Sequence, residues 1–175
     1  MASDMAFMAA DLYSSALYDC MLKLGRLQEG SEVKWKRNTD GSEHLPVGPS
    51  VMIHDSVKGE APFEFFLLNL HLLEWAMTVG LVDWIESHYD FEVGMKLAAE
   101  IEIGADWSSK ETWNWTKRGL TDILVRTVDK HRKIHGSALK SIKGKKSKEI
   151  VKSMFSDFDK QKKILKVNKY YPLNV

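Results

Sequence analysis

The sequence predicts an α+β fold in which a small antiparallel sheet packs on a long apolar helix, followed by two basic amphipathic helices. Three patterns indicate this fold: an apolar run over 62–88, period-two alternation over 91–107, and helical stripes in the last third. The chain has 175 residues, of which 44% are hydrophobic and 28% charged, as in folded globular proteins. We expect one domain, with an acidic α+β body over 1–116 and a basic helical part over 117–175.

The N-terminal segment predicts a helix followed by a strand. Ser3 can cap a helix, because its hydroxyl can accept a backbone N–H of the first turn. From Ala16 onward the pattern alternates, with Tyr18, Cys20 and Leu22 on one side, which is typical of a strand. Short strands are also expected at 33–37 and 51–54.

The apolar run predicts a central core helix. Pro62 suits the first position of a helix, and Glu64 suits its first turn. Gly80 is a candidate break within the run. Polar residues such as Glu64 and Glu74 interrupt it, and a carboxylate at membrane depth is costly, so we expect no transmembrane segment.

The alternation over 91–107 predicts a half-buried strand with an acidic outer face. Gly94 and Gly104 are candidate bends, because the run exceeds the usual strand length. A returning strand is expected at 112–116. Trp107, Trp113 and Trp115 could stack on the bases of nucleic acid beside Lys117 and Arg118, although their alternation favours core packing.

The last third predicts two helices. Leu120, Ile123, Leu124 and Val128 share the face of one helix, for which Gly136 is a stop signal. Ser147 is expected to cap the second helix. The apolar stripe of this second helix consists of Ile150, Val151, Met154, Phe155, Phe158 and Leu165.

Charge is divided between the two parts of the chain. Residues 1–116 hold 8 Lys and Arg against 19 Asp and Glu, whereas residues 117–175 hold 17 against 5. Such a division indicates either an anionic partner or head-to-tail self-association, in which the basic part of one copy docks on the acidic part of another. Pairing of the two parts within one molecule, or a solvated helix face, is the plain alternative.

The basic part is the candidate binding region. Basic side chains neutralise phosphates and are equally attracted to anionic lipid head groups, so the expected partner is nucleic acid or an anionic membrane surface. The densest cluster lies over 143–148. The candidate polyanion-binding residues are Lys117, Arg118, Lys130, Arg132, Lys133, Lys140, Lys143, Lys145, Lys146 and Lys148.

Catalytic patterns are weak. Asp19 followed by Glu32 and Lys34 has the order found in metal-dependent nucleases, where carboxylates hold the metal and lysine polarises water. A simpler interpretation than a nuclease site is a hairpin with charged side chains on its solvent-exposed face. His131 and His135 have the i,i+4 spacing of metal ligands, but the basic residues between them repel a cation.

Other active-site signatures are missing from the sequence. Glu100, Glu102 and Asp106 would share one strand face, which either supports acid–base chemistry or is an outer acidic face. The single cysteine, Cys20, excludes an intramolecular disulfide and a thiolate zinc cluster. The sequence contains no phosphate-binding glycine loop. We expect no metal, no cofactor and no enzymatic activity.

Together these features predict a non-enzymatic structural or assembly protein that binds nucleic acid or an anionic membrane through its basic third and associates with itself. Small viral matrix and nucleocapsid-associated proteins share this profile, which is an analogy of class. A protein–protein adaptor and the nuclease remain alternatives. The start of the sequence lacks the basic and apolar regions of a signal peptide, so we expect an intracellular protein of the cytoplasm, with the nucleus as alternative.

Overall fold

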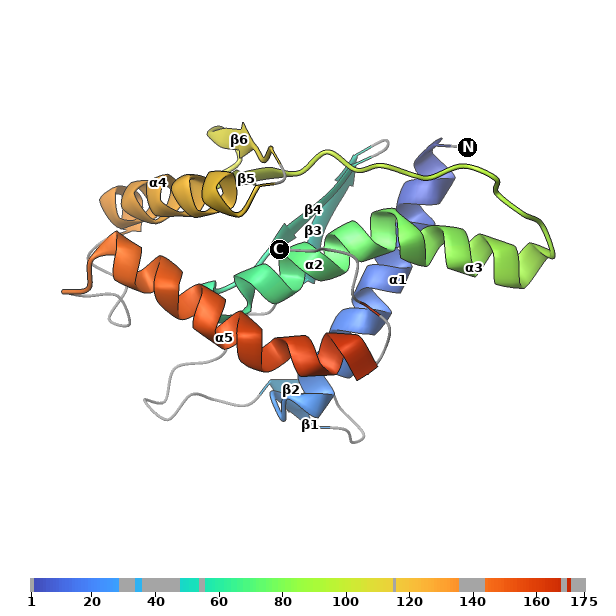
Figure 1. The fold of residues 1–175 in the computed structure, drawn as a ribbon, viewed down its shortest axis with the longest axis horizontal. Helices are drawn as coiled ribbons and strands as arrows, with labels where there is room; N and C mark the ends of the chain where they lie inside the picture. Colours follow the sequence, from blue (N-terminus) through green and yellow to red (C-terminus); the bar gives the residue numbers. More distant parts are fainter. Residues whose placement is uncertain are drawn as a thin grey trace. The chain divides into compact units, whose positions relative to one another are not determined.

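The computed structural model describes residues 2–28, 34–35, 48–53, 56–114, 116–135, 144–167 and 170 (Figure 1). Their contacts form two compact units. Unit 1 combines the chain up to Ala99 with the second half of the last helix, from Phe158 onward, and unit 2 runs from Glu100 to Asp157. The fold is α+β, as predicted. The single domain stays a prediction.

Unit 1 begins with α1 (Ala2–Lys23), an uninterrupted helix. The strand predicted from Ala16 onward is therefore wrong. Tyr18 lies on an exposed face, while Cys20 is buried, so the apparent alternation does not match the buried side. The buried residues recur at helical spacing, and many are small alanines that let α1 pack closely on its neighbours. They are Ala6, Ala9, Ala10, Tyr13, Ala16, Leu17, Cys20 and Met21.

The β structure of unit 1 consists of two antiparallel pairs. β1 (Leu27–Gln28) pairs with β2 (Lys34–Trp35), and β3 (Gly48–Ile53) pairs with β4 (Ser56–Glu60). The β3–β4 pair contacts α1, and β4 also contacts α2. A small antiparallel sheet packed against helices is therefore confirmed.

The long apolar helix is divided into η1 (Phe63–Phe65), α2 (Phe66–Met77) and α3 (Val79–Tyr89). It breaks at Thr78, whose hydroxyl donates to the carbonyl of Glu74 at 2.7 Å. Gly80, the predicted break, lies just after it. A Cβ at this position would lie 2.6 Å from the Trp75 ring, so the close packing requires glycine.

No single helix of the described residues has the length and apolar composition to cross a membrane. The two segments Phe63–Met77 and Val79–Tyr89, bent at about 40°, pass that test only when taken together.

The second half of α5 (Ser147–Val167) belongs to unit 1 and packs on α2. The ring of Phe158 stacks on His71 with centroids 4.3 Å apart. The Gln161 amide donates to the carbonyl of Glu64 at 2.9 Å. Leu165 is completely buried. These contacts confirm this half of the predicted apolar stripe.

Unit 2 contains the hairpin of β5 (Glu102–Gly104) and β6 (Lys110–Thr112), then α4 (Lys117–His135) and the first half of α5. The predicted strand over 91–107 is wrong for most of its length, because only three of its residues pair with another strand. The returning strand lies two residues earlier than predicted and ends at Thr112.

The amphipathic character of α4 is confirmed. Leu120, Leu124 and Val128 are almost completely buried, and Ile123 is 5% exposed. The helix begins after Thr116, whose hydroxyl accepts the backbone N–H of Gly119 at 3.0 Å. This is an N-cap contact, which satisfies a donor that has no partner within the helix.

Candidate functional site

The end of α4 and the start of α5 are held together by Ser147. Its hydroxyl donates to the carboxylate of Asp129 and accepts from the Arg132 guanidinium at 3.3 Å. Ser147 is buried, so these bonds also satisfy a polar group that has left water. The predicted cap role of Ser147 is therefore corrected, because its hydroxyl links two helices.

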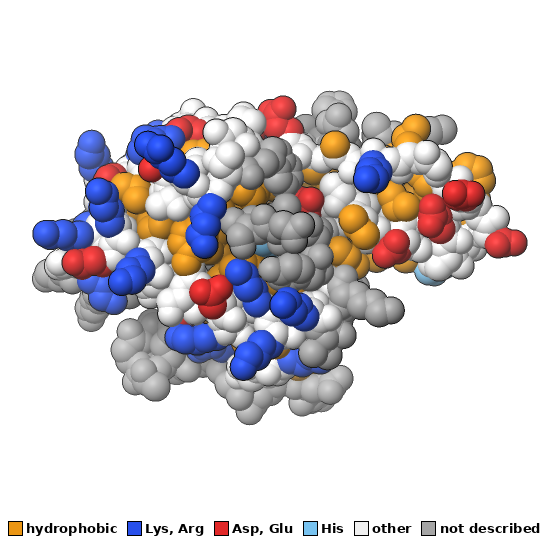
Figure 2. Space-filling view, in the orientation of Figure 1, with side chains coloured by type: hydrophobic (Ala, Val, Ile, Leu, Met, Phe, Trp, Pro, Cys, Tyr) orange, Lys and Arg blue, Asp and Glu red, His pale blue; other side chains and the backbone are white. Residues whose placement is uncertain are grey.

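This junction gathers four lysines that we call the basic end: Lys133 on α4, and Lys145, Lys146 and Lys148 around Ser147. All four are exposed. None of them forms an ion pair with another residue of the described part of the chain. Figure 2 shows Lys and Arg side chains distributed over α4 and α5 on the visible face. Among the described residues, the basic end is therefore a group of exposed lysines without ion-pair partners.

The start of α5 carries these cations at the electrically unfavourable end of the helix. The positive end of a helix dipole repels cations and attracts anions. Glu149 offsets part of this repulsion, because its carboxylate accepts the backbone N–H of Lys146 at 3.1 Å. The remaining charge favours an anion near Lys145, Lys146 and Lys148.

The other predicted binding residues have different surroundings. Lys117 and Arg118 open α4, at its opposite end. Lys130 is paired with Asp106 at 3.3 Å, and the Arg132 guanidinium donates a hydrogen bond to the Ser147 hydroxyl. Lys140 and Lys143 lie outside the described residues.

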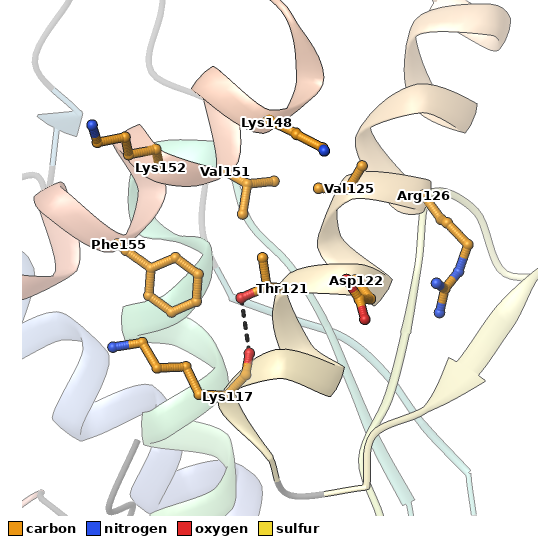
Figure 3. Close-up of a pocket in the computed structure, with 9 residues that line it drawn as sticks. All are labelled: Lys117, Thr121, Asp122, Val125, Arg126, Lys148, Val151, Lys152 and Phe155. Carbon is orange, nitrogen blue, oxygen red and sulfur yellow. Dashed lines mark hydrogen bonds between the residues drawn. The ribbon is translucent and has the colours of Figure 1, made fainter.

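A groove of about 600 Å³ lies between α4 and the first half of α5 (Figure 3). Val125, Val151 and Phe155 form its apolar floor. Its other lining residues are Lys117, Thr121, Asp122, Arg126, Lys148 and Lys152.

Among the described residues, the unpaired positive charge of the groove lies on its lysines, and Asp122 adds one carboxylate to the lining. Arg126 is neutralised by Glu111, with two nitrogen–oxygen distances of 2.6 and 2.9 Å. The Lys117 ammonium lies 5.6 Å from the centre of the Phe155 ring, within the range of a cation–π contact. Lys152 is exposed at the rim. The groove thus combines an apolar floor with cations available to an acidic ligand.

Sequence reasoning missed this groove because its two walls are far apart in the chain. The only local signal is on α5, where Lys152 and Phe155 are three residues apart and therefore share a helix face.

The two described tryptophans of the predicted cluster, Trp107 and Trp113, differ in exposure. Trp113 is 1% exposed, and its indole nitrogen donates to the carbonyl of Thr116 at 2.9 Å, so its predicted core position is confirmed. Trp107 is 49% exposed, so its predicted core position is wrong. Trp115 lies outside the described residues.

The strand arrangement expected of a nuclease is wrong for Asp19. This residue lies on α1 and pairs with Lys23 one turn later, at 3.0 Å. Lys34 lies in β2, and Glu32 is outside the described residues.

Two of the three acidic residues of the predicted strand face, Glu102 and Asp106, have structural partners. Glu102 pairs with Lys110 across the β5–β6 hairpin. Asp106 accepts hydrogen bonds from the hydroxyls of Ser108 and Ser109, which hold the pKa of its carboxyl well below the usual range. A carboxylate with a lowered pKa is a poor general base.

Burial shifts the pKa values of two other reactive side chains, Cys20 and His131. Cys20 is buried, which raises the pKa of its thiol to about 12 and keeps it protonated at neutral pH. Partial burial lowers the pKa of His131, whose ring lies 4.7 Å from that of His135. Among the described residues, no three His, Cys, Asp or Glu side chains are arranged to hold a metal ion.

Unit 1 contains a buried polar group on α2. The hydroxyl of Tyr13 donates to the side-chain oxygen of Asn69. Burial lowers the pKa of His71 to about 3 and raises the pKa of Glu74 to about 7. The Glu74 Oε2 atom is buried and has no hydrogen-bond partner among the described residues. Buried polar groups without partners lower the stability of the folded state.

No protein-family model, curated protein or solved structure matches this chain. Its function is therefore inferred from its own residues.

Proposed function

We propose that this chain is a non-enzymatic assembly protein that binds nucleic acid through the basic end. The observation that carries the proposal is the gathering of Lys133, Lys145, Lys146 and Lys148 where α4 meets α5, exposed and without ion pairs among the described residues. The proposal includes an intracellular location, where nucleic acid is available.

Phosphates fit the electrostatics of this surface. Lysines that contact a nucleic acid release its condensed counterions. This release supplies most of the part of the affinity that does not depend on base sequence. A phosphate beside the start of α5 would also offset the repulsion between the positive end of the helix dipole and the ammonium groups of Lys145 and Lys146.

Nucleic acid is favoured over a membrane surface because α4 and the first half of α5, which carry the basic end, bury their apolar stripes. The apolar residues of α4 and of the first half of α5, such as Leu124 and Ile150, are buried. The large hydrophobic residues exposed in the described part of unit 2 are Trp107 and Ile134. Stable binding of a helix to a membrane surface requires a wider apolar face or a lipid anchor.

The test uses the full chain with labelled single-stranded and double-stranded oligonucleotides and, separately, vesicles containing anionic lipid. The variant Lys133→Ala/Lys145→Ala/Lys146→Ala should lower the affinity for nucleic acid by about tenfold or more at low salt. Its thermal stability should change little, because surface substitutions usually alter it by about 0.5 kcal/mol or less.

A matched control removes the same charge elsewhere. Lys23→Ala/Lys96→Ala/Lys163→Ala takes three lysines from unit 1 and should leave the affinity close to that of the parent. Equal losses in both triple variants would show that net charge, and not the basic end, determines binding. Tight binding to vesicles without binding to oligonucleotides would replace nucleic acid by a membrane as the partner.

A further inference from the structure

Unit 1 has an exposed surface that carries both acidic and apolar side chains. It lies where α3 ends and comprises residues 89–95, which we call the acidic segment. Tyr89, Phe91 and Met95 are 62, 61 and 66% exposed. Single exposed apolar residues are common, but three large ones within seven residues form a patch that indicates an interaction surface.

The acidic segment alternates these apolar side chains with carboxylates. Asp90 and Glu92 are both exposed. In Figure 2, Asp and Glu side chains gather with hydrophobic ones over α3 and the chain that follows it. The backbone is fixed at one point, because the Val93 N–H donates to the Glu86 carboxylate at 3.1 Å. The segment therefore presents its side chains without a strand partner among the described residues.

The α4–α5 groove has the complementary chemistry. Its floor of Val125, Val151 and Phe155 can receive apolar side chains, and its volume of about 600 Å³ is that of a typical ligand pocket. Lys117 and Lys152 at its rim can pair with carboxylates.

We propose that the acidic segment of one copy docks in the α4–α5 groove of a second copy. Phe91 and Met95 would contact the apolar floor, while Asp90 and Glu92 would pair with Lys117 and Lys152. Burying these side chains supplies affinity, and the paired charges set the orientation.

This contact would be head-to-tail, because each copy contributes the acidic segment to one neighbour and the groove to another. Such a contact generates rings or open chains of subunits. It supplies the assembly interface of the proposed function and goes beyond nucleic-acid binding. Of the four lysines of the basic end, Lys148 also lines the groove, whereas Lys133, Lys145 and Lys146 do not.

The test is sedimentation velocity of the full chain over a range of concentrations at low salt. The parent should associate, and association should weaken as the Debye length falls to about 3 Å at 1 M salt. Phe91→Ser/Met95→Ser should weaken association by about tenfold or more, because it removes the side chains that fill the groove. Lys117→Glu/Lys152→Glu should weaken association to a similar extent, because the new carboxylates at the rim would repel those of the acidic segment.

Two controls keep the changes matched. Phe7→Ser removes an aromatic side chain that is 58% exposed on α1 and should not alter association. Lys133→Glu/Lys145→Glu reverses two charges at the basic end, and should preserve association while it weakens nucleic-acid binding. Loss of association in this second control, with the groove intact, would contradict the proposal.

Mixing the two defective variants is the decisive step. The acidic-segment variant retains its groove, and the groove variant retains its acidic segment, so a mixture should form a 1:1 complex that grows no further. This result also shows that both variants are folded. A mixture that stays monomeric, or a parent that is monomeric at every concentration, would overturn the proposal. The latter result together with intact nucleic-acid binding would leave the function of the basic end standing.

Discussion

The substitution Glu74→Gln tests the physical account of the core of unit 1. Glu74 is 9% exposed, and burial raises the pKa of its carboxyl from 4.5 to about 7. The folded protein therefore holds a proton on Glu74 more tightly than the unfolded chain does. The stability linked to this proton is fully present below pH 4.5 and is lost as the pH rises to about 7.

The magnitude follows from the shift. One pKa unit corresponds to about 1.4 kcal/mol, so the shift of Glu74 corresponds to about 3 kcal/mol of unfolding free energy at pH 8. Glutamine removes the charge and keeps the shape of the side chain. We expect Glu74→Gln to gain about 2 to 3 kcal/mol relative to the parent between pH 4.5 and pH 8.

The assay is denaturant unfolding of parent and variant at several pH values, combined with an NMR titration of the Glu74 carboxyl carbon. The difference between the two proteins isolates Glu74, because other titrating groups such as His71 are common to both. Leu72→Val is the control: it removes a methylene from the same helix and should cost about 1 kcal/mol at every pH. A difference for Glu74→Gln that does not vary with pH, or a titration midpoint near 4.5, would refute the reasoning.

Two further predictions concern single residues. Thr116→Ala should lower the unfolding free energy by about 1 kcal/mol, because α4 loses its N-cap hydroxyl, and Thr116→Ser should restore most of it in the same denaturation assay. Cys20 should react with a thiol reagent no faster than the protein opens, because its thiol is buried and its pKa is raised to about 12; rapid labelling of the native protein at pH 7.5 would contradict this.

The parts of the fold that depend on local periodicity could be predicted from the sequence. The stripes of α4 and α5 appear as predicted, since Leu120, Leu124, Ile150 and Met154 are buried. Their 3.6-residue spacing repeats over several turns, which leaves no competing interpretation. The break in the apolar helix was located within two residues, because glycine at position 80 marks a close approach.

The parts that depend on distant partners could not be predicted. An alternating pattern indicates a strand only if another strand is available for pairing, and for the described residues after Phe91 the partner is restricted to β6. In α1, Leu17, Cys20 and Met21 continue the buried helical face past Ala16, but the apparent alternation of Tyr18, Cys20 and Leu22 outweighed this short stretch of helical spacing. Local pattern alone cannot weigh these tertiary contacts.

The candidate site shows the same division. The basic composition of the last third indicated an anionic partner, but did not show which lysines are engaged in the fold. The structure separates Lys130, which is paired with Asp106, from exposed lysines such as Lys145 and Lys146. Ser147, which joins α4 to α5, appeared in the sequence only as a cap.

The central claim is that the basic end contacts phosphates, and the salt dependence of nucleic-acid affinity tests it most directly. The logarithm of the association constant should fall linearly with the logarithm of salt concentration, by about 0.9 per duplex phosphate or 0.7 per single-strand phosphate contacted. Replacing Lys133, Lys145 and Lys146 with alanine should reduce this slope by about two to three units. An affinity independent of salt, or a slope that is unchanged in the triple variant, would contradict the account.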